Sequence, residues 1–384
     1  MNKRNLAIDL FRGLTMALMV FVNDFWAILD VPHWMEHFKT MEDGMGLSDI
    51  VYPMFLFAMG MSVPYPIERR YAKGYTGEET IRHIFSRTVA LLLMGAFIVN
   101  SEAGVAWNKG IYWLLMVAGF FLVWNQYPKD FRPAKGLRIA GTVLLTGLAL
   151  AYRSPDGGLF RSSWWGILGL IGWAYLPCAL AFLFLKGDFS KLTGFWLLTL
   201  LLCVLNASPA IPAGFSVRAV ILGFWPGGWT HPALCASGMF TSLLLIRFGD
   251  KPRNLVSYFF TFALAMFLLG MLSHRYWIIS KIQATPTWLF FCVAVSVALF
   301  DLLYWIADVK ARTRWARPIA PAGTATLTCY TIPYIWYAVQ QLLGLHWPDV
   351  LTAGIPGLLK ALAFSFVIIG LTWTFGKIHL KLKI

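Results

Sequence analysis

The stretch "LFRGLTMALMVFVNDFWAIL", residues 10–29, decides the fold class, because it is long and apolar enough to cross a lipid bilayer. A bilayer core requires about 20 apolar residues in a helix. Similar runs recur along all 384 residues, of which 58% are hydrophobic and 13% charged. A typical soluble domain is about 25% charged. The sequence therefore predicts an all-α, polytopic transmembrane helical bundle that forms a single integral-membrane domain, 1–384.

We expect about twelve spans, with a range of 10 to 12. The N-terminus has a basic start, as a signal peptide does, but its apolar part is long, contains Asp9 and Arg12, and lacks an A-x-A cleavage site. We therefore expect a retained first span. The candidate spans centre on residues 10–30, 49–66, 84–100, 110–126, 138–152, 164–185, 193–207, 229–247, 255–273, 286–306, 320–343 and 355–376.

The basic residues are distributed unequally between alternate loops. Because cytoplasmic loops carry an excess of Lys and Arg, the alternate loops that are rich in these residues are predicted to be cytoplasmic, together with both termini. This asymmetry accounts for the net charge of +14 without a nucleic-acid partner. The rich loops contain Lys3, Arg4, Arg69, Arg70, Lys73, Arg82, Lys129, Arg132, Lys135, Arg138, Lys186, Lys191, Arg247, Lys251, Arg253, Lys310, Arg312, Arg314, Arg317, Lys377, Lys381 and Lys383; the poor loops contain Lys39, Lys109, Arg153, Arg161, Arg218, Arg275 and Lys281.

The five cysteines are scattered in or beside apolar runs and form no CxxC or Cys/His ligand spacing. We therefore expect neither a zinc site nor a disulfide framework, and no metal.

Charged groups inside spans are costly, so they are usually paired or functional. Asp9 and Arg12 are three residues apart, and therefore lie on one helix face, where they can pair with each other. One interpretation is a structural ion pair; the other is that Arg12 helps to bind an anionic ligand. In the second span, Ser48 resembles an N-cap and Asp49 falls in the first turn, where it suits the helix dipole. Pro53 and Gly60 are expected to bend or thin the helix and to let a neighbour or ligand approach closely.

The third span begins near Arg87 and ends at Asn100. An arginine at the end of a span is most often an anchor whose charged head reaches the interface. Its planar guanidinium also matches phosphate oxygens.

The loop "HWMEHFKTMEDG", residues 33–44, places His33 and His37 among Glu36, Glu42 and Asp43. One interpretation is a solvated turn whose histidines have no function. The other is a proton-transfer or nucleophilic histidine oriented by an acid. A metal site from both histidines would need a helix across them, which this Pro-flanked segment does not guarantee.

Three motifs together resemble the heparan-α-glucosaminide N-acetyltransferase family and its bacterial relatives, within the transmembrane acyltransferases. They are "DLFRGLTMALMVFVND" (9–24), "GMGLSDIVYPMFLFAMGMSVP" (44–64) and "SRTVALLLMGAFIVN" (86–100). The resemblance is strongest over residues 5–104. It implies a membrane enzyme that transfers an acetyl group from cytosolic acetyl-CoA to an acceptor on the far side, here of the bacterial inner membrane.

The resemblance also implies roles for particular residues. His37, or His33 as second choice, matches the catalytic histidine, and Asp49, Asn23 and Asn100 match positions around it. We expect Asn23 and Asn100 to hold the carbonyl oxygen. Arg12 and Arg87, with Asp9 beside Arg12, match the positions expected to bind acetyl-CoA.

The predicted function is thus an acetyl-CoA-dependent N-acetyltransferase acting on an amino sugar or glycan, with glucosamine as the model acceptor. The alternative is a multi-span transporter or flippase for a sugar-containing or anionic substrate, in which Asp9, Asp24 and Asp49 relay protons. Trp26 and other tryptophans are available to stack on a sugar, although an interfacial aromatic belt explains them equally. A homodimer is compatible with the sequence.

Overall fold

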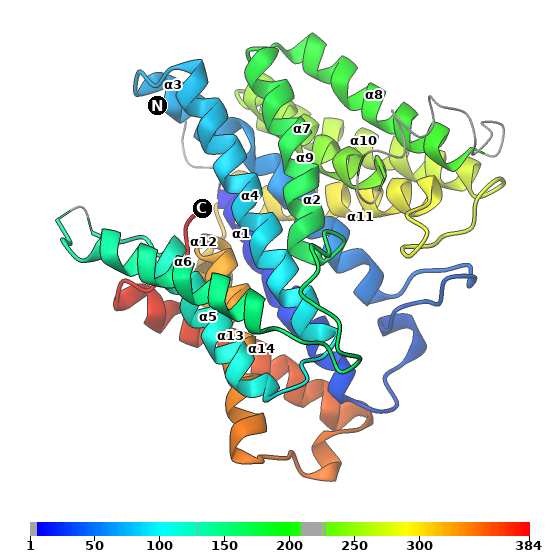
Figure 1. The fold of residues 1–384 in the computed structure, drawn as a ribbon. Helices are drawn as coiled ribbons and strands as arrows, with labels where there is room; N and C mark the ends of the chain where they lie inside the picture. Colours follow the sequence, from blue (N-terminus) through cyan, green and yellow to red (C-terminus); the bar gives the residue numbers. More distant parts are fainter. Residues whose placement is uncertain (1–5, 129, 209–224, 226–227) are drawn as a thin grey trace. The chain divides into compact units, whose positions relative to one another are not determined.

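The computed structural model describes residues 6–128, 130–208, 225 and 228–384; Lys3, Arg4, Lys129 and Arg218 lie outside this part. The described chain is helical, and its β-structure is limited to the isolated bridges Leu29–Ala353 and Asn125–Leu382. The α-helices are α1 (Leu6–Asn23), α2 (Leu47–Ser62), α3 (Pro64–Ala72), α4 (Gly77–Glu102), α5 (Lys109–Trp124), α6 (Ala134–Ala151), α7 (Ile167–Phe184), α8 (Phe189–Ala207), α9 (Thr230–Phe248), α10 (Pro252–Ser273), α11 (Pro286–Tyr304), α12 (Ala320–Thr324), α13 (Thr326–Leu343) and α14 (Gly354–Lys377) (Figure 1). The shorter helices are η1 (Asp24–Ala27), η2 (His33–Met35), η4 (Trp305–Val309), η5 (Arg314–Ile319) and η6 (Asp349–Leu351).

Nine helical segments of the described chain are long and apolar enough to cross a membrane, which confirms the helical, membrane-protein class. The segment in α10, for example, has 22 residues. At a rise of 1.5 Å per residue this length is about 33 Å, close to the roughly 30 Å of a bilayer core. The nine segments are Leu6–Ala27, Leu47–Ala72, Gly77–Glu102, Ala134–Ala151, Ile167–Phe184, Phe189–Ala207, Pro252–Ser273, Pro286–Val309 and Gly354–Lys377.

The predicted count of about twelve spans is not confirmed by these nine segments. The remaining three predicted spans coincide with α5, α9 and α13. Helix α5 has only 16 residues, while α9 and α13 are rich in Ser, Thr, Gly or Tyr and are therefore less apolar. The orientation of the termini stays a prediction.

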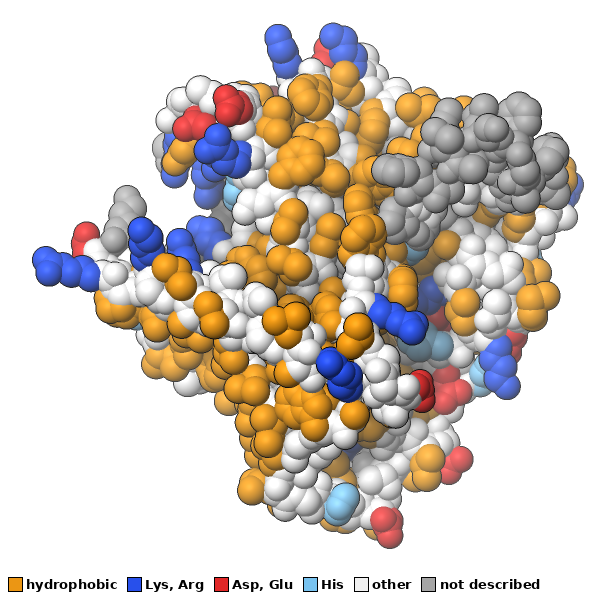
Figure 2. Space-filling view, viewed as in Figure 1, with side chains coloured by type: hydrophobic (Ala, Val, Ile, Leu, Met, Phe, Trp, Pro, Cys, Tyr) orange, Lys and Arg blue, Asp and Glu red, His pale blue; other side chains and the backbone are white. Residues whose placement is uncertain are grey.

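Several helices expose apolar faces, as expected of surfaces that meet lipid rather than water. Leu150 on α6 is 73% exposed, and Phe260 on α10 is 64% exposed. Figure 2 shows broad areas of hydrophobic side chains on the visible face, with Lys and Arg side chains in separate clusters. In a water-soluble protein, exposed apolar areas of this extent would favour aggregation.

The chain divides into two compact units. Unit 1 comprises Met1–Thr15, Pro32–Val89 and Leu170–Ala316, and within it α9 packs against α2 and α8, and α10 against α11. Unit 2 comprises Met16–Val31, Ala90–Gly169 and Arg317–Ile384, and within it α5 packs against α6 and α13, and α14 against α12 and α13 (Figure 1).

Glycines bring α2 and α9 into backbone contact within unit 1. A Cβ atom on Gly60 would collide with the backbone carbonyl of Cys235, and one on Gly238 would collide with the carbonyl of Phe57. The expectation that Gly60 admits a close neighbour is therefore confirmed. Small residues have this role in membrane bundles, where close helix packing replaces the hydrophobic driving force.

Replacing Gly238 by alanine is expected to lower the stability of the purified protein. The added methyl meets backbone, which cannot move aside as a side chain can, so we expect a loss of about 1–3 kcal/mol. The measurement is thermal unfolding in detergent.

Gly194 in α8 provides the matched control, because an added Cβ there meets no atom within 4 Å. Gly194→Ala is expected to leave the melting temperature unchanged or raise it slightly, since alanine favours helix. Equal melting temperatures for Gly238→Ala and the unmodified protein would refute the close-packing account of α2 and α9.

Candidate functional site

The two histidines of the loop at 33–44 are held by different acids. Helix η2 covers only His33–Met35, so no helix places His33 and His37 on one face. His33 Nε2 lies 2.7 Å from Glu42 Oε1, and its ring stacks on Phe38 with centroids 4.3 Å apart. The described residues contain no group of three His, Cys, Asp or Glu side chains placed to hold a metal ion.

His37 forms a short hydrogen bond with a buried carboxylate. Its Nδ1 lies 2.7 Å from Asp49 Oδ1; the His37 side chain is 58% exposed and that of Asp49 only 2%. A carboxylate accepts, so we assign the imidazole proton to Nδ1. The lone pair of Nε2, which has no hydrogen-bond partner among the described residues, is then directed away from Asp49.

Asp49 is fixed by backbone donors at the start of α2. Its Oδ2 accepts from the N–H of Phe38 at 3.0 Å and of Gly46 at 3.2 Å. The carboxylate thus ties the loop to the first turn of the helix, where a negative charge is favoured by the helix dipole. The prediction that Ser48 caps this helix is wrong. Gly46 is the N-cap, and the Ser48 hydroxyl instead donates to the carbonyl of Met35 at 2.6 Å.

A proline frees the backbone carbonyl of Asp49 for a tertiary contact. Pro53 has no N–H, so it cannot donate to the residue four positions earlier. The indole Nε1 of Trp288, a fully buried residue of α11, donates to the Asp49 carbonyl at 3.1 Å. The same arrangement recurs in unit 1, where Pro177 leaves the carbonyl of Trp173 to accept from Trp225 Nε1 at 3.2 Å.

Lys281 completes the charged cluster, a role that was not predicted from the sequence. Its Nζ lies 3.2 Å from His37 Nδ1, 3.7 Å from Asp49 Oδ1 and 3.4 Å from the carbonyl oxygen of Ser48. Because Nδ1 carries the proton that it donates to Asp49, Nδ1 cannot accept from Lys281, and the ammonium group is a neighbouring charge rather than a hydrogen-bond donor to the imidazole. Burial lowers the pKa of Lys281, and the Asp49 carboxylate offsets part of that shift. The sequence signal available was that Lys281 is one of few cations in a basic-poor loop.

The segment that carries Lys281 is bonded to the histidine loop through Asp43. The Asp43 carboxylate lies 2.8 Å from His274 Nε2 and accepts from the N–H of Ile279 at 2.8 Å. Burial raises the pKa of Asp43, but these two hydrogen bonds lower it by more, so the pKa of the carboxyl group is below its ordinary value. Gln283 adds a bond from Nε2 to the carbonyl of Thr40 at 2.7 Å. These hydrogen bonds therefore fix the histidine loop and the 274–285 segment against each other.

The residues expected to bind acetyl-CoA lie on α1 and α4 of unit 1. Arg12 Nη1 lies 3.9 Å from Asp9 Oδ1, so the predicted pairing is present but long. Arg87 places its guanidinium 4.6 Å from the ring centroid of Tyr175 and lies 3.4 Å from the sulfur of Met59. The Nε of Arg87 is buried and has no hydrogen-bond acceptor among the described residues.

The two asparagines expected to hold a carbonyl oxygen lie in unit 2 and differ in environment. Asn100 is buried, and its Nδ2 donates to the carbonyls of Ala96 and Arg161, each at 2.7 Å. Its Oδ1 accepts from the N–H of Arg161 at 3.1 Å. Both amide hydrogens are thus committed to backbone. Asn23, by contrast, is exposed and lines a cavity of unit 2.

Comparison with known proteins shows that the chain is distantly similar to an acetyltransferase. A family described as a domain of unknown function (DUF5009) matches residues 4–183, a range that includes His37 and Asp49 but ends before Lys281. The chain is 27% identical over 135 residues to the heparan-alpha-glucosaminide N-acetyltransferase of Mus musculus, and 30% identical over 107 residues to that of Homo sapiens. These matches cover 32% and 27% of this chain, but only 20% and 15% of the curated relatives. The chain is therefore an all-helical integral membrane protein with a distant relationship to heparan-alpha-glucosaminide N-acetyltransferase.

Proposed function

We propose that this protein is a membrane acetyltransferase that moves an acetyl group from acetyl-CoA to an amino sugar or glycan acceptor, with His37 as the reacting residue. The observation that carries the proposal is the 2.7 Å bond between His37 Nδ1 and the buried Asp49, on an imidazole that is otherwise 58% exposed. A base or nucleophile requires an accessible nitrogen, and the acid behind it fixes the tautomer.

In the nucleophilic route, Nε2 of His37 attacks the thioester carbonyl. The Nε2–C bond forms, the C–S bond breaks, and CoA leaves as the thiolate. The amine of the acceptor then attacks the acetyl carbon, the N–C bond forms, the Nε2–C bond breaks, and the freed Nε2 takes the proton that the amine loses. In the direct route, the amine attacks the thioester carbonyl while Nε2 takes its proton; the N–C bond forms, the C–S bond breaks, and CoA leaves as the thiolate. In both routes the imidazole becomes positive, and Asp49 stabilises that charge.

For the donor substrate, we propose that Arg12 and Arg87 receive the phosphates of acetyl-CoA, with Asp9 orienting Arg12. The unbonded Nε of Arg87 supports this role, because a guanidinium with an unused donor can bind phosphate oxygen. Both arginines belong to the same unit as His37. Asn23 lines a cavity of unit 2, whereas His37 and both arginines belong to unit 1, so the proposed steps use no contact with Asn23. Asn100 is better described as a structural residue, since its amide hydrogens already bond backbone.

We further propose the bacterial inner membrane as the location, with acetyl-CoA bound from the cytoplasm and the acceptor on the outer side. The span pattern and the charge asymmetry of the loops support this orientation. Under this arrangement the His37 loop faces outward.

A transporter is the second candidate, and one observation favours it. Asp24 and Lys360 form a buried ion pair in unit 2, with Oδ2 and Nζ 2.8 Å apart, and Tyr337 donates to Asp24 at 3.1 Å. Charges inside membrane helices often mark transport pathways. A transporter would move substrate without consuming acetyl-CoA.

Substitution of the His37–Asp49 pair is expected to abolish acetyl transfer. His37→Ala removes the reacting nitrogen, and Asp49→Asn leaves a neutral side chain that stabilises neither the tautomer nor the imidazolium. We expect rate losses of about 10²- to 10⁴-fold, the usual contribution of a positioned acid or base. The measurement is CoA release from labelled acetyl-CoA by purified protein, with and without glucosamine.

His33→Ala is the matched control, because His33 lies in the same loop but bonds Glu42, whose side chain is half-exposed rather than buried as that of Asp49 is. Its activity is expected to stay within a few-fold of the unmodified protein. Retention of full activity by His37→Ala would rule out the proposed role. Absence of acetyl-CoA turnover in the unmodified protein as well as in the variants would favour the transporter.

Replacing Lys281 by methionine is expected to lower the rate of acetyl transfer, measured as CoA release. The ammonium lies 3.7 Å from Asp49 Oδ1 and compensates the charge of that buried carboxylate, so its loss disturbs the acid that orients His37. We expect a loss of about ten-fold, which corresponds to roughly 1.4 kcal/mol. Lys39→Met, which removes an exposed cation from the histidine loop, should leave the rate unchanged. An unchanged rate in Lys281→Met would show that Lys281 acts only in packing.

A further inference from the structure

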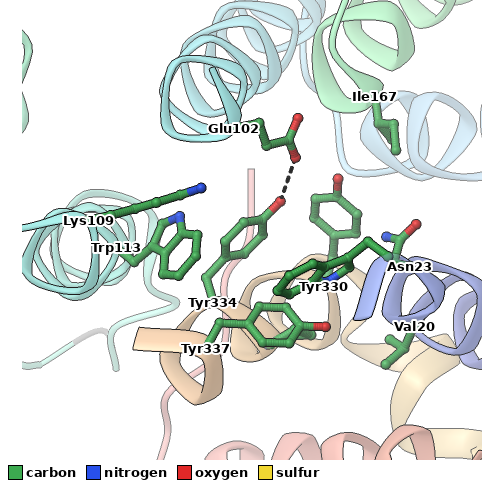
Figure 3. A pocket seen from close by; sticks show the side chains of 11 residues that line it. Val20, Asn23, Glu102, Lys109, Trp113, Ile167, Tyr330, Tyr334 and Tyr337 are labelled. Carbon is green, nitrogen blue, oxygen red and sulfur yellow. Dashed lines mark hydrogen bonds between the residues drawn. The ribbon is translucent and has the colours of Figure 1, made fainter. Parts of the chain in front are cut away.

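Unit 2 contains an aromatic cavity that the chemistry at His37 does not use. Its volume is about 370 Å³, and it is lined by side chains from α1, η1, α4, α5, α7 and α13. Figure 3 shows aromatic rings on several sides of this cavity. The aromatic lining residues are Trp26, Trp113, Tyr330, Tyr334 and Tyr337.

Polar groups stand at defined points among these rings. Glu102 accepts a hydrogen bond from the hydroxyl of Tyr334 at 3.2 Å, and Lys109 lies over Trp113 with its Nζ 4.8 Å from the ring centroid (Figure 3). The Trp113 side chain is only 9% exposed, yet its Nε1 has no hydrogen-bond acceptor in the described part of the chain. A buried indole N–H normally finds a partner, so an unmet donor in a cavity wall points to a ligand with an acceptor oxygen.

A second cavity adjoins the first and shares part of its wall. It has a volume of about 710 Å³. Both are lined by Trp26, Lys109, Trp113 and Tyr337. The second adds another large ring, Trp347, together with the side-chain amides of Gln340 and Gln341. The two hollows therefore form neighbouring compartments around a common group of rings.

The charges of this cleft disfavour ionic ligands. Glu102 in the first cavity opposes an anion such as a nucleotide, whereas Lys109 in the same wall opposes a quaternary cation, the usual occupant of an aromatic cage. In the second cavity, Asp24 and Lys360 neutralise each other at 2.8 Å. A lipid chain would leave the carboxylate, amides and indole N–H without partners.

A saccharide fits both the aromatic rings and the polar groups of these cavities. A pyranose has flat C–H faces that pack on aromatic rings, and its hydroxyls both donate and accept hydrogen bonds. Side-chain amides and a carboxylate match those hydroxyls. We propose that the two cavities are adjacent subsites of one saccharide-binding cleft, which takes a ligand of at least two pyranose rings rather than a monosaccharide. The identification of that saccharide as the acetyl acceptor rests on the proposed function.

The test is calorimetric titration of the full-length protein in detergent, without acetyl-CoA. The probes are glucosamine, its β-1,4-linked disaccharide, tetramethylammonium and inorganic phosphate. We expect the disaccharide to bind at least ten-fold more tightly than glucosamine, and the two ions not to bind. Equal affinity for both sugars would overturn the two-subsite arrangement, and binding of either ion instead of the sugars would overturn the saccharide assignment.

Trp26→Ala is the variant of choice, because Trp26 lines both cavities yet is 71% exposed, so its loss should leave folding intact. We expect it to weaken disaccharide binding at least ten-fold. Trp165→Ala is the matched control: Trp165 is 66% exposed in the same unit and lines neither cavity. Equal weakening in both variants would refute the cleft. Tyr334→Phe, which removes only the hydroxyl bonded to Glu102, provides a second variant with little risk to folding.

The outcomes separate this proposal from the acetyltransferase. His37→Ala should bind the disaccharide as the unmodified protein does. Saccharide binding without acetyl transfer would support the cleft and refute the enzyme. Acetyl transfer that is unaffected by Trp26→Ala, in a protein that binds no saccharide in calorimetry, would support the enzyme and refute the cleft.

Discussion

The buried carboxylate of Asp49 organises the histidine loop of unit 1. Its two oxygens accept the ring N–H of His37 and the backbone N–H groups of Phe38 and Gly46, while the Lys281 ammonium lies nearby. Hydrogen bonds to charged groups contribute about 1.5–3 kcal/mol each, and a buried carboxylate without them would be strongly unfavourable. The conformation of the loop is therefore set by the requirement to satisfy one acid. Because His37 is among the donors, its ring orientation follows from the same requirement.

Asp49 also connects the loop to the helices, because Pro53 leaves the backbone carbonyl of Asp49 without its helical hydrogen-bond donor. The missing N–H of the proline leaves the Asp49 carbonyl to accept from Trp288, which anchors the start of α2 against α11. Asp43 meanwhile bonds His274 and Ile279 in the segment just before α11. Two acids six residues apart thus bind the loop to the same region of the chain through different donors. A histidine supported in this way has little conformational freedom to lose on binding a substrate, as the role proposed for His37 requires.

The sequence predicted the helices well, because apolar runs of membrane length leave few alternatives. It was less successful with α9 and α13, whose small, hydroxylated or aromatic residues suit close packing as well as a span. Within the site, residue type and resemblance selected His37 and Asp49, which lie in contact. Ser48 was misassigned as a cap because serine commonly caps helices, whereas Gly46 takes that position and leaves the hydroxyl free to bond Met35. The contact between Lys281 and Asp49 could not be predicted, since 232 residues separate them and no local pattern connects them; the scarcity of cations in the loops of Lys281's set marks the residue but not its partner.

The Asp24–Lys360 pair and the His37–Asp49 pair have different environments, and this difference bears on the proposed role of each. Asp24 and Lys360 have side chains only 6% and 5% exposed, so each is enclosed and compensates the charge of the other. Opening such a pair would leave an uncompensated buried charge, which typically costs about 3–5 kcal/mol. His37 combines a buried acid with an exposed ring, so its Nε2 can meet a substrate while the Asp49 bond stays intact. The buried pair is suited to holding helices together, whereas the half-exposed pair meets the access requirement of the role proposed for His37.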